Sequence, residues 1–258
     1  AEGYGPMKFL SLFAGIGGLD LGCEIAGWQS VYQCEIDPFC RAVLAKHWPN
    51  VPRHDDVRTL TGDMVRDAVG AVDAIVGGFP CQDVSNAGKR AGIDGARSGL
   101  WAEYFRLVCE IRPRIVFVEN VTGLLVRGLG RVLGDMASVG YDAEWTVLSA
   151  CRFGAPHSRE RMFLTAYSGE IGRLAWPNQM SLPTGCNQWK ATEGKREWKD
   201  LERWIVETFH DCYGAADAPA LQRVDDGLTD RLDRLAACGN AVVPQCAAVI
   251  ARAITESQ

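Results

Sequence analysis

Apolar runs that alternate with amphipathic segments are the feature of this sequence that most constrains its fold. Residues 72–78 (VDAIVGG) and 114–121 (RIVFVENV) are almost continuously apolar, which is typical of strands buried on both faces of a parallel sheet. Between them, residues 97–111 have helical periodicity. This order predicts an α/β fold: a Rossmann-like, mostly parallel sheet with helices on both faces. Such folds bind ligands at the carboxyl ends of their strands.

The rest of the chain extends this alternation and then departs from it. We expect further strands at residues 8–13, 30–36, 145–150 and 161–167, and helices at 19–27, 38–48, 129–140 and 241–254. After Tyr167 the composition changes, with four tryptophans among Gly, Pro, Lys and Glu and weak periodicity. We therefore expect a ligand-binding domain at 7–167, a small irregular module at 168–231 and a segment at 232–258 that returns to the first domain.

Cysteine spacing and hydropathy exclude several classes of protein. The ten cysteines are scattered, without a C-x-x-C pair or a Cys/His cluster at zinc spacing. We therefore expect no metal site and a reducing, cytoplasmic environment. No apolar run approaches the roughly 18 residues that span a membrane, so we expect no membrane association. The formal net charge of −5 argues mildly against non-specific nucleic-acid binding, although it is compatible with a local basic groove.

A glycine-rich turn, residues 13–18 (FAGIGG), joins the first expected strand to the first helix. Its three glycines let a ligand approach the backbone, and a helix N-terminus favours an anionic group. Glu35 ends the second strand, where an acid can bind ribose hydroxyls, and Asp56 follows a third strand region, where it could accept from an adenine amino group. This pattern suits any adenosine ligand, NAD included. The structural alternatives are a plain turn at the glycines and a solvated turn at Asp56.

A second group of reactive side chains is expected at neighbouring strand ends. Cys81 follows the run at 72–78, and a thiol at a strand end can act as a nucleophile if its pKa is depressed. Glu119 ends the next buried strand, where a carboxylate needs a partner or a task. Arg159 and Arg161 open a later strand. The structural alternatives are a helix cap or ion pair for Glu119 and a surface charge cluster for the arginines.

Five motifs in this order carry a family resemblance. They are residues 13–18 (FAGIGG), 78–82 (GFPCQ), 119–121 (ENV), 159–161 (RER) and 239–244 (GNAVVP). The set resembles the cytosine-C5 DNA methyltransferase family and covers roughly residues 8–167 and 232–256. The resemblance implies an enzyme with the class I methyltransferase fold.

The resemblance implies S-adenosyl-L-methionine as the cofactor. The glycine-rich turn would lie against it, with Glu35 on the ribose and Asp56 at the adenine. The residues that the resemblance places around the cofactor are Phe13, Ala14, Gly15, Ile16, Gly17, Gly18, Leu19, Glu35, Ile36, Asp56, Val57, Pro80, Leu100, Asn240 and Val242.

The resemblance also implies roles for the second group. Cys81 would add to C6 of cytosine, which makes C5 nucleophilic enough to take a methyl group. Glu119 would hydrogen-bond or protonate N3. One residue of the pair Arg159 and Arg161 would bind cytosine O2, and the other would support Glu119 or the loop. The sequence does not assign these two tasks.

Double-stranded DNA is the partner that the resemblance implies, and the target base must be flipped out of the duplex. The glycine-spaced basic stretch at residues 88–97 is then expected to close over the DNA; a flexible solvated loop is the alternative. The expected DNA contacts are Gln82, Ser85, Lys89, Arg90, Arg97 and Asn120.

The sequence departs from the family in three places. His157 stands where the family usually has Gln, and Ser11 stands where its first motif often begins with an acid. The module at 168–231 is much shorter than a typical target-recognition region, as in compact methyltransferases of phages and mobile elements. Its tryptophans could stack on bases or pack a small core. A restriction–modification setting is compatible with the resemblance, and we expect a monomer.

Three other functions stay open at this stage. An RNA cytosine methyltransferase of the transfer-RNA type would use the same chemistry. A nucleic-acid-binding module without catalysis would not need both Cys81 and Glu119. A nicotinamide-linked oxidoreductase would share only the glycine-rich turn and the acid at Glu35.

Overall fold

The computed structural model describes residues 5–80, 99–153, 159–168 and 242–256. Several predicted features lie outside these ranges: the module at 168–231 apart from Ser168, the basic stretch at 88–97 and the residue His157. The predicted site residues outside them are Cys81, Gln82, Ser85, Lys89, Arg90, Arg97 and Asn240.

A seven-stranded sheet forms the centre of the described structure, in the order β3-β2-β1-β4-β5-β7-β6. The five strands from β3 to β5 are parallel, whereas β7 runs antiparallel to β5 and β6 antiparallel to β7. The strands are β1 (Lys8–Leu12), β2 (Gln29–Cys34), β3 (Arg53–His54), β4 (Ala74–Gly77), β5 (Ile115–Asn120), β6 (Tyr141–Ser149) and β7 (Glu160–Ser168). The predicted mostly parallel sheet is confirmed.

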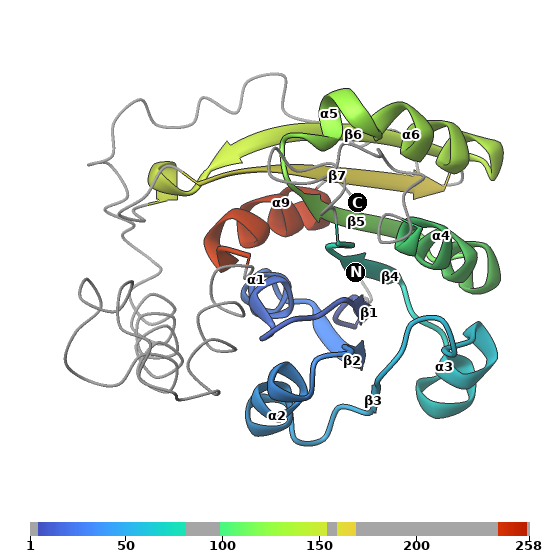
Figure 1. Ribbon diagram of the computed structural model, residues 1–258. Helices are drawn as coiled ribbons and strands as arrows, with labels where there is room; N and C mark the ends of the chain where they lie inside the picture. The colour runs from blue at the N-terminus through green and yellow to red at the C-terminus, as the bar shows by residue number, and fades with distance from the viewer. Residues whose placement is uncertain (1–4, 81–98, 154–158, 169–241, 257–258) are drawn as a thin grey trace, which may run out of the picture.

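Helices cover both faces of this sheet (Figure 1). They are α1 (Gly18–Ile25), α2 (Pro38–His47), α3 (Gly62–Val69), α4 (Leu100–Ile111), α5 (Leu124–Arg127), α6 (Leu129–Ser138) and α9 (Pro244–Glu256), with a short 3₁₀ helix η2 (Ala150–Phe153). The far C-terminal helix α9 packs beside α1, close to the first strand of the chain. The helix predicted at 241–254 is thus present as α9 and packs against α1, while the domain boundaries at 167 and 231 stay a prediction.

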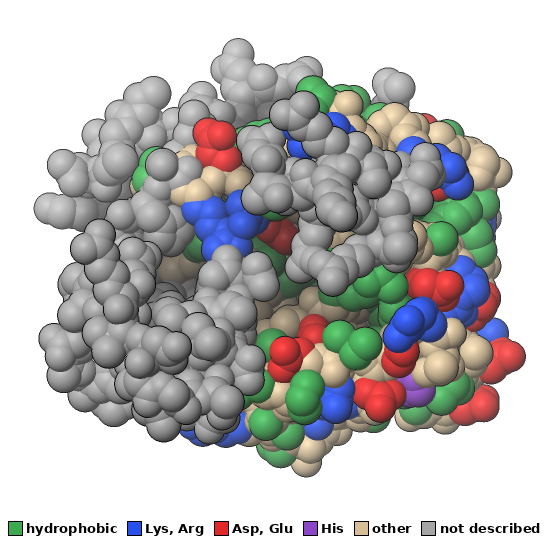
Figure 2. All heavy atoms as spheres, in the orientation of Figure 1, with side chains coloured by type: hydrophobic (Ala, Val, Ile, Leu, Met, Phe, Trp, Pro, Cys, Tyr) green, Lys and Arg blue, Asp and Glu red, His purple; other side chains and the backbone are tan. Residues whose placement is uncertain are grey.

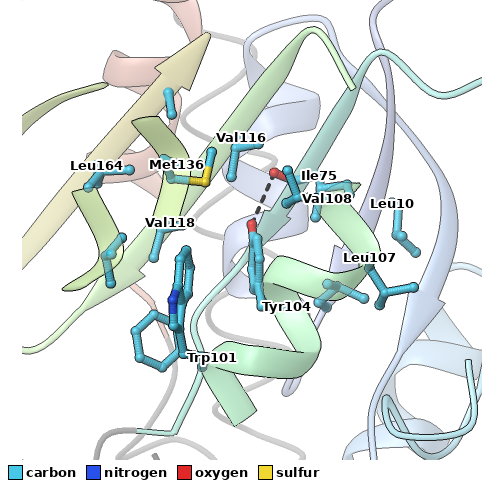
Figure 3. Close-up of a cluster of buried hydrophobic side chains, with 14 of the residues drawn as sticks. Leu10, Ile75, Trp101, Tyr104, Leu107, Val108, Val116, Val118, Met136 and Leu164 are labelled. Carbon is cyan, nitrogen blue, oxygen red and sulfur yellow. Dashed lines mark hydrogen bonds between the residues drawn. The ribbon is translucent and has the colours of Figure 1, made fainter. Parts of the chain in front are cut away.

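Two hydrophobic clusters, one on each face, explain why the central strands are continuously apolar. On one face, helices α3, α4 and α6 pack over Leu10, Ile75 and Val116 (Figure 3). On the other, α1 and α9 pack over residues of opposite parity, such as Val76 and Phe117. Because successive strand residues point to opposite faces, β4 and most of β5, which are covered on both sides, are apolar at every position.

Side-chain caps and prolines set where two of the helices begin. The Asp37 carboxylate accepts from the backbone N–H groups of Phe39 and Cys40 at 2.8 and 3.1 Å, and Pro38 occupies the first turn of α2. The Thr61 hydroxyl accepts from the Met64 N–H at the start of α3. The periodicity did not predict α3, because most of this short helix is exposed and only Gly62 and Val65 are buried.

None of the helices in the described ranges is long and apolar enough to cross a membrane. Within the same ranges, no group of three or more His, Cys, Asp or Glu side chains could hold a metal ion.

Candidate active site

The carboxyl ends of the parallel strands bring the predicted site residues to one edge of the sheet. The segments after β1, β2, β4 and β5 all start there. Because β7 is antiparallel to β5, with Asn120 opposite Met162, the beginning of β7 reaches the same edge. Figure 2 shows Lys and Arg atoms beside a hollow of the surface that is lined in part by hydrophobic and acidic side chains.

The glycine-rich turn after β1 needs a backbone that only glycine adopts easily. Gly15 and Gly17 have φ values of +56° and +85°. A Cβ atom on Gly17 would lie 2.4 Å from the Trp48 ring, whereas a Cβ on Gly15 would meet no described atom within 4 Å. Gly18 opens α1 against Val242, whose carbonyl oxygen would lie 2.5 Å from an added Cβ. The turn thus packs closely behind Gly17 and Gly18 and has open space at Gly15.

The Glu35 carboxylate lies directly against this turn. Its two oxygens accept from the backbone N–H groups of Gly15 and Asp37 at 2.7 and 2.9 Å. Burial raises the pKa of Glu35, and these hydrogen bonds oppose the rise. The next side chain, Ile36, is 61% exposed, an unusual position for a large aliphatic residue. An acid and an exposed apolar side chain therefore stand together at the end of β2.

The buried carboxylate of Asp20, which was not predicted from the sequence, connects the helix after the glycine-rich turn to the neighbouring strands. Asp20, in the first turn of α1, accepts from the hydroxyls of Ser11 and Ser30 at 2.7 and 3.1 Å and from the Gln33 amide at 2.9 Å. It is fully buried, and burial raises its pKa. Asp20 thereby joins α1 to both β1 and β2. Its place within one helical turn of the glycines was the available signal.

Asp56, predicted at the adenine, lies in the loop after β3. Arg58 binds it through its side chain at 2.7 Å and through its backbone N–H, and lowers the pKa of Asp56 to about 2. The adjacent Val57 is buried, and its carbonyl accepts from Arg106 of α4 at 2.9 Å. The helix α4 begins at Leu100, so it contacts the predicted cofactor residue Val57 and contributes the predicted cofactor residue Leu100.

Glu119 and the two arginines come together at the end of β5. The Nε atom of Arg161 lies 2.9 Å from Oε1 of Glu119, whose residue is only 7% exposed. Burial raises the pKa of Glu119 to about 7, although the charges of Arg161 and Arg159 lower it. Burial lowers the pKa of Arg159, and the neighbouring Arg161 charge adds to this effect. The geometry therefore identifies Arg161 as an ion-pair partner of Glu119.

The segment that leads to the predicted nucleophile runs beside Glu119. A Cβ on Gly78 would lie 2.8 Å from Oε2 of Glu119, so the chain after β4 passes the carboxylate at close range. Phe79 is buried, and its carbonyl oxygen accepts from the Asn120 side-chain amide at 3.1 Å. Pro80 is the last described residue before Cys81. The role of Asn120 as a DNA contact stays a prediction, and its contacts here are with the backbone.

Comparison with known proteins adds the family relationship. The family model described as C-5 cytosine-specific DNA methylase matches residues 7–181. The Type II methyltransferase M2.BsuMI of Bacillus subtilis is 38% identical over 168 residues, which cover 62% of this chain but only 42% of that protein. The Type II methyltransferase M.AquIA of Picosynechococcus is 33% identical over 174 residues, covering 61% of this chain and 70% of the relative.

A solved structure extends the likeness to nearly the whole chain. The crystal structure of the Dnmt2 methyltransferase from Schizosaccharomyces pombe aligns with a TM-score of 0.62 over 97% of this chain and 99% of that one. At 16% sequence identity, this likeness shows the fold alone.

Proposed function

Because the chain belongs to the C-5 cytosine-specific DNA methylase family, we propose that it transfers a methyl group from S-adenosyl-L-methionine to C5 of cytosine in double-stranded DNA. The single observation that carries the proposal is the buried Glu119 beside the strand end that leads to Cys81. Burial raises the pKa of Glu119 to about 7, and Arg161 lies against it. An acid with a pKa near neutrality can hold or give a proton at physiological pH.

The described residues suit an adenosine-containing cofactor. The space at Gly15 lets a ligand approach the backbone, and α1 begins three residues later. Each Glu35 oxygen already accepts one backbone hydrogen bond and keeps a further lone pair for a ribose hydroxyl. The exposed Ile36 side chain offers an apolar surface for the adenine ring. S-adenosyl-L-methionine, when bound, supplies an electrophilic methyl group.

The chain's own residues prepare the cytosine for that methyl group. The Cys81 thiolate attacks C6, and the electron pair of the C5–C6 double bond becomes available at C5. Glu119 donates a proton or a hydrogen bond to N3, so that negative charge does not build up on the ring. Arg161 lies against Glu119, and Arg159, the other guanidinium at this strand end, is proposed to bind cytosine O2. After methyl transfer, loss of the C5 proton and departure of Cys81 restore the aromatic ring.

The DNA-binding part of the proposal rests on the sequence. The target base must leave the duplex to reach a buried carboxylate. Gln82, Ser85 and the basic residues of 88–97 are proposed to contact the DNA, and residues 168–231 to carry target recognition.

Parallel methyl-transfer assays test this function. The protein is incubated with radiolabelled S-adenosyl-L-methionine and with either duplex DNA or transfer RNA. We expect label in duplex DNA as 5-methylcytosine, and no label for the Cys81→Ala variant, which should still bind the cofactor in calorimetry. Label in transfer RNA alone would show that the substrate is RNA rather than DNA. Methyl transfer by Cys81→Ala would show that Cys81 is not the nucleophile.

A further inference from the structure

We propose that Trp101 and Asn120 form a clamp on Phe79 that positions the nucleophile Cys81, and that Asp135 acts through Trp101. The inference rests on the proposed function, because it assigns positioning residues to that reaction. It starts from two independent contacts that meet on one residue, Phe79, just before Cys81 in the chain.

Trp101 holds the Phe79 side chain. The two ring centroids lie 5.2 Å apart, and the residues are only 3% and 2% exposed. The Tyr104 ring stacks on the Trp101 ring, with 5.6 Å between their centroids. The Tyr104 hydroxyl donates to the carbonyl oxygens of Ile75 and Phe117 (Figure 3). Aromatic pairs in such geometry stabilise each other beyond the burial of their surfaces. The aromatic rings of α4 therefore form a fixed support beneath the end of β4.

Asp135 fixes the orientation of Trp101. The indole Nε1–H donates to Oδ2 of Asp135 at 2.9 Å, and Arg131 pairs with the same carboxylate at 2.8 Å. A buried indole N–H without an acceptor would be costly. Because Asp135 belongs to α6 and Trp101 to α4, this bond also ties two helices together below the site.

Asn120 holds the Phe79 backbone. Its Nδ2 donates to the Phe79 carbonyl at 3.1 Å, and its Oδ1 accepts from the Val121 N–H at 2.8 Å. The side chain is 4% exposed, and both ends of its amide are used within the protein. Asn120 is thus a bridge between the end of β5, where Glu119 lies, and the segment that carries the thiol.

The two contacts together fix Phe79, from which the chain continues through Pro80 to Cys81. Trp101 fixes the Phe79 side chain and Asn120 fixes its carbonyl, so Phe79 cannot rotate without breaking one of them. Pro80 then limits the backbone, since its φ is held near −65°. An error of about 1 Å in the place of a reacting atom can cost about a hundredfold in rate. The clamp therefore acts on the rate of attack rather than on the binding of DNA or cofactor.

Covalent trapping separates positioning from binding. With saturating S-adenosyl-L-methionine, duplex DNA that carries 5-fluorocytosine retains the enzyme as a Cys81 adduct, because fluorine cannot leave C5 as a proton after methyl transfer. The rate of adduct formation at saturating DNA then reports the attack and the methyl transfer that follows it. The first variant is Asn120→Asp, which keeps the acceptor for Val121 and loses the donor to Phe79. We expect a rate at least tenfold lower, with dissociation constants for DNA and S-adenosyl-L-methionine within threefold of wild type. Asn50→Asp, at an exposed position, is the matched control and should change neither.

A second set of variants tests the side-chain contact without removing the ring. Trp101→Phe keeps an aromatic side chain and loses the bond to Asp135, and Asp135→Ala loses the same bond from the other side. We expect each to slow adduct formation about threefold or more, and the double variant to be no slower than the slower single one. Asp135→Asn keeps an oxygen acceptor for the indole N–H and should restore most of the rate.

The outcomes distinguish this inference from the proposed function. If the wild type forms no adduct, the proposed function fails and the clamp with it. If the wild type forms an adduct and Asn120→Asp matches its rate, the clamp alone is wrong. If Asn120→Asp weakens DNA binding and leaves the saturated rate unchanged, Asn120 is a DNA contact instead. Alkylation of Cys81 by iodoacetamide, followed by peptide mass mapping, gives a readout without turnover, and an altered rate in Asn120→Asp is expected.

Discussion

Glu119 and Arg161 form an ion pair across two antiparallel strands, with 2.9 Å between Oε1 and Nε. The pair exists because β7 runs opposite to β5 and so begins where β5 ends. Burial disfavours the ionised form of Glu119 and raises its pKa, whereas the two guanidiniums favour the ionised form and lower it. The resulting pKa is about 7. A pKa in this range suits Glu119 to exchange a proton at neutral pH.

The raised pKa of Glu119 predicts a pH-dependent stability. A carboxyl whose folded-state pKa lies above its ordinary value of 4.5 stabilises the fold fully below pH 4.5, and this contribution is lost as the pH rises through about 7. Glu119→Gln cannot ionise. From pH 5 to pH 8, the wild type should therefore lose more unfolding free energy than Glu119→Gln, by at most about 3 kcal/mol.

Urea unfolding at pH 5 and pH 8 measures this difference. Glu256→Gln, at an exposed position of α9, is the control and should keep the pH dependence of the wild type. Equal slopes for the wild type and Glu119→Gln would contradict the raised pKa.

Gly78 should not tolerate a side chain. Because a Cβ there would meet Oε2 of Glu119 at 2.8 Å, Gly78→Ala must displace the carboxylate or the segment that leads to Cys81. We expect methyl transfer to fall at least tenfold and stability to fall by about 1–3 kcal/mol. Gly134→Ala in α6 meets no described atom and should instead stabilise the helix by about 0.5–1 kcal/mol. Full activity in Gly78→Ala would rule out this close packing.

The fold could be predicted largely from the sequence, because strands buried on both faces leave an unmistakable apolar pattern. Residues 72–78 and 114–121 gave two central strands and placed Glu119 at a strand end. The helix α3 was not predicted, since it has only eight residues and only two of them, Gly62 and Val65, are buried. The five motifs gave the family, which the comparisons confirm.

The pairing of side chains within the site could not be predicted, because strand order and register create it. The sequence left the tasks of Arg159 and Arg161 open, and the register of β7 against β5 brings Arg161 into an ion pair with Glu119. The contact of Asn120 with Phe79 depends in the same way on β4 and β5 being neighbours.

Asp20 should matter for stability although nothing in the reaction uses it. Asp20→Ala would leave the buried polar groups of Ser11, Ser30 and Gln33 without their shared acceptor. An unsatisfied buried group costs about 1–3 kcal/mol, so we expect a loss at the upper end of this range or beyond. Denaturant unfolding checks this, with Asp67→Ala on the exposed side of α3 as the control. A loss below 1 kcal/mol would mean that the network contributes little.

Glu35 should be required for cofactor affinity. Glu35→Ala removes both the proposed ribose acceptor and the hydrogen bond that orders Gly15. We expect the dissociation constant for S-adenosyl-L-methionine to rise at least tenfold in calorimetry, whereas Glu144→Ala on β6 should leave it unchanged. Unaltered affinity in Glu35→Ala would place the cofactor elsewhere.

The most direct test of the whole account is the mass of the protein after reaction with S-adenosyl-L-methionine and duplex DNA that contains 5-fluorocytosine. We expect a denaturation-resistant complex whose tryptic mapping places the DNA on Cys81, with the methyl group retained on the fluorinated base, and no complex for Cys81→Ala. Methyl transfer to ordinary cytosine DNA without any such complex, or a complex through another residue, would contradict it.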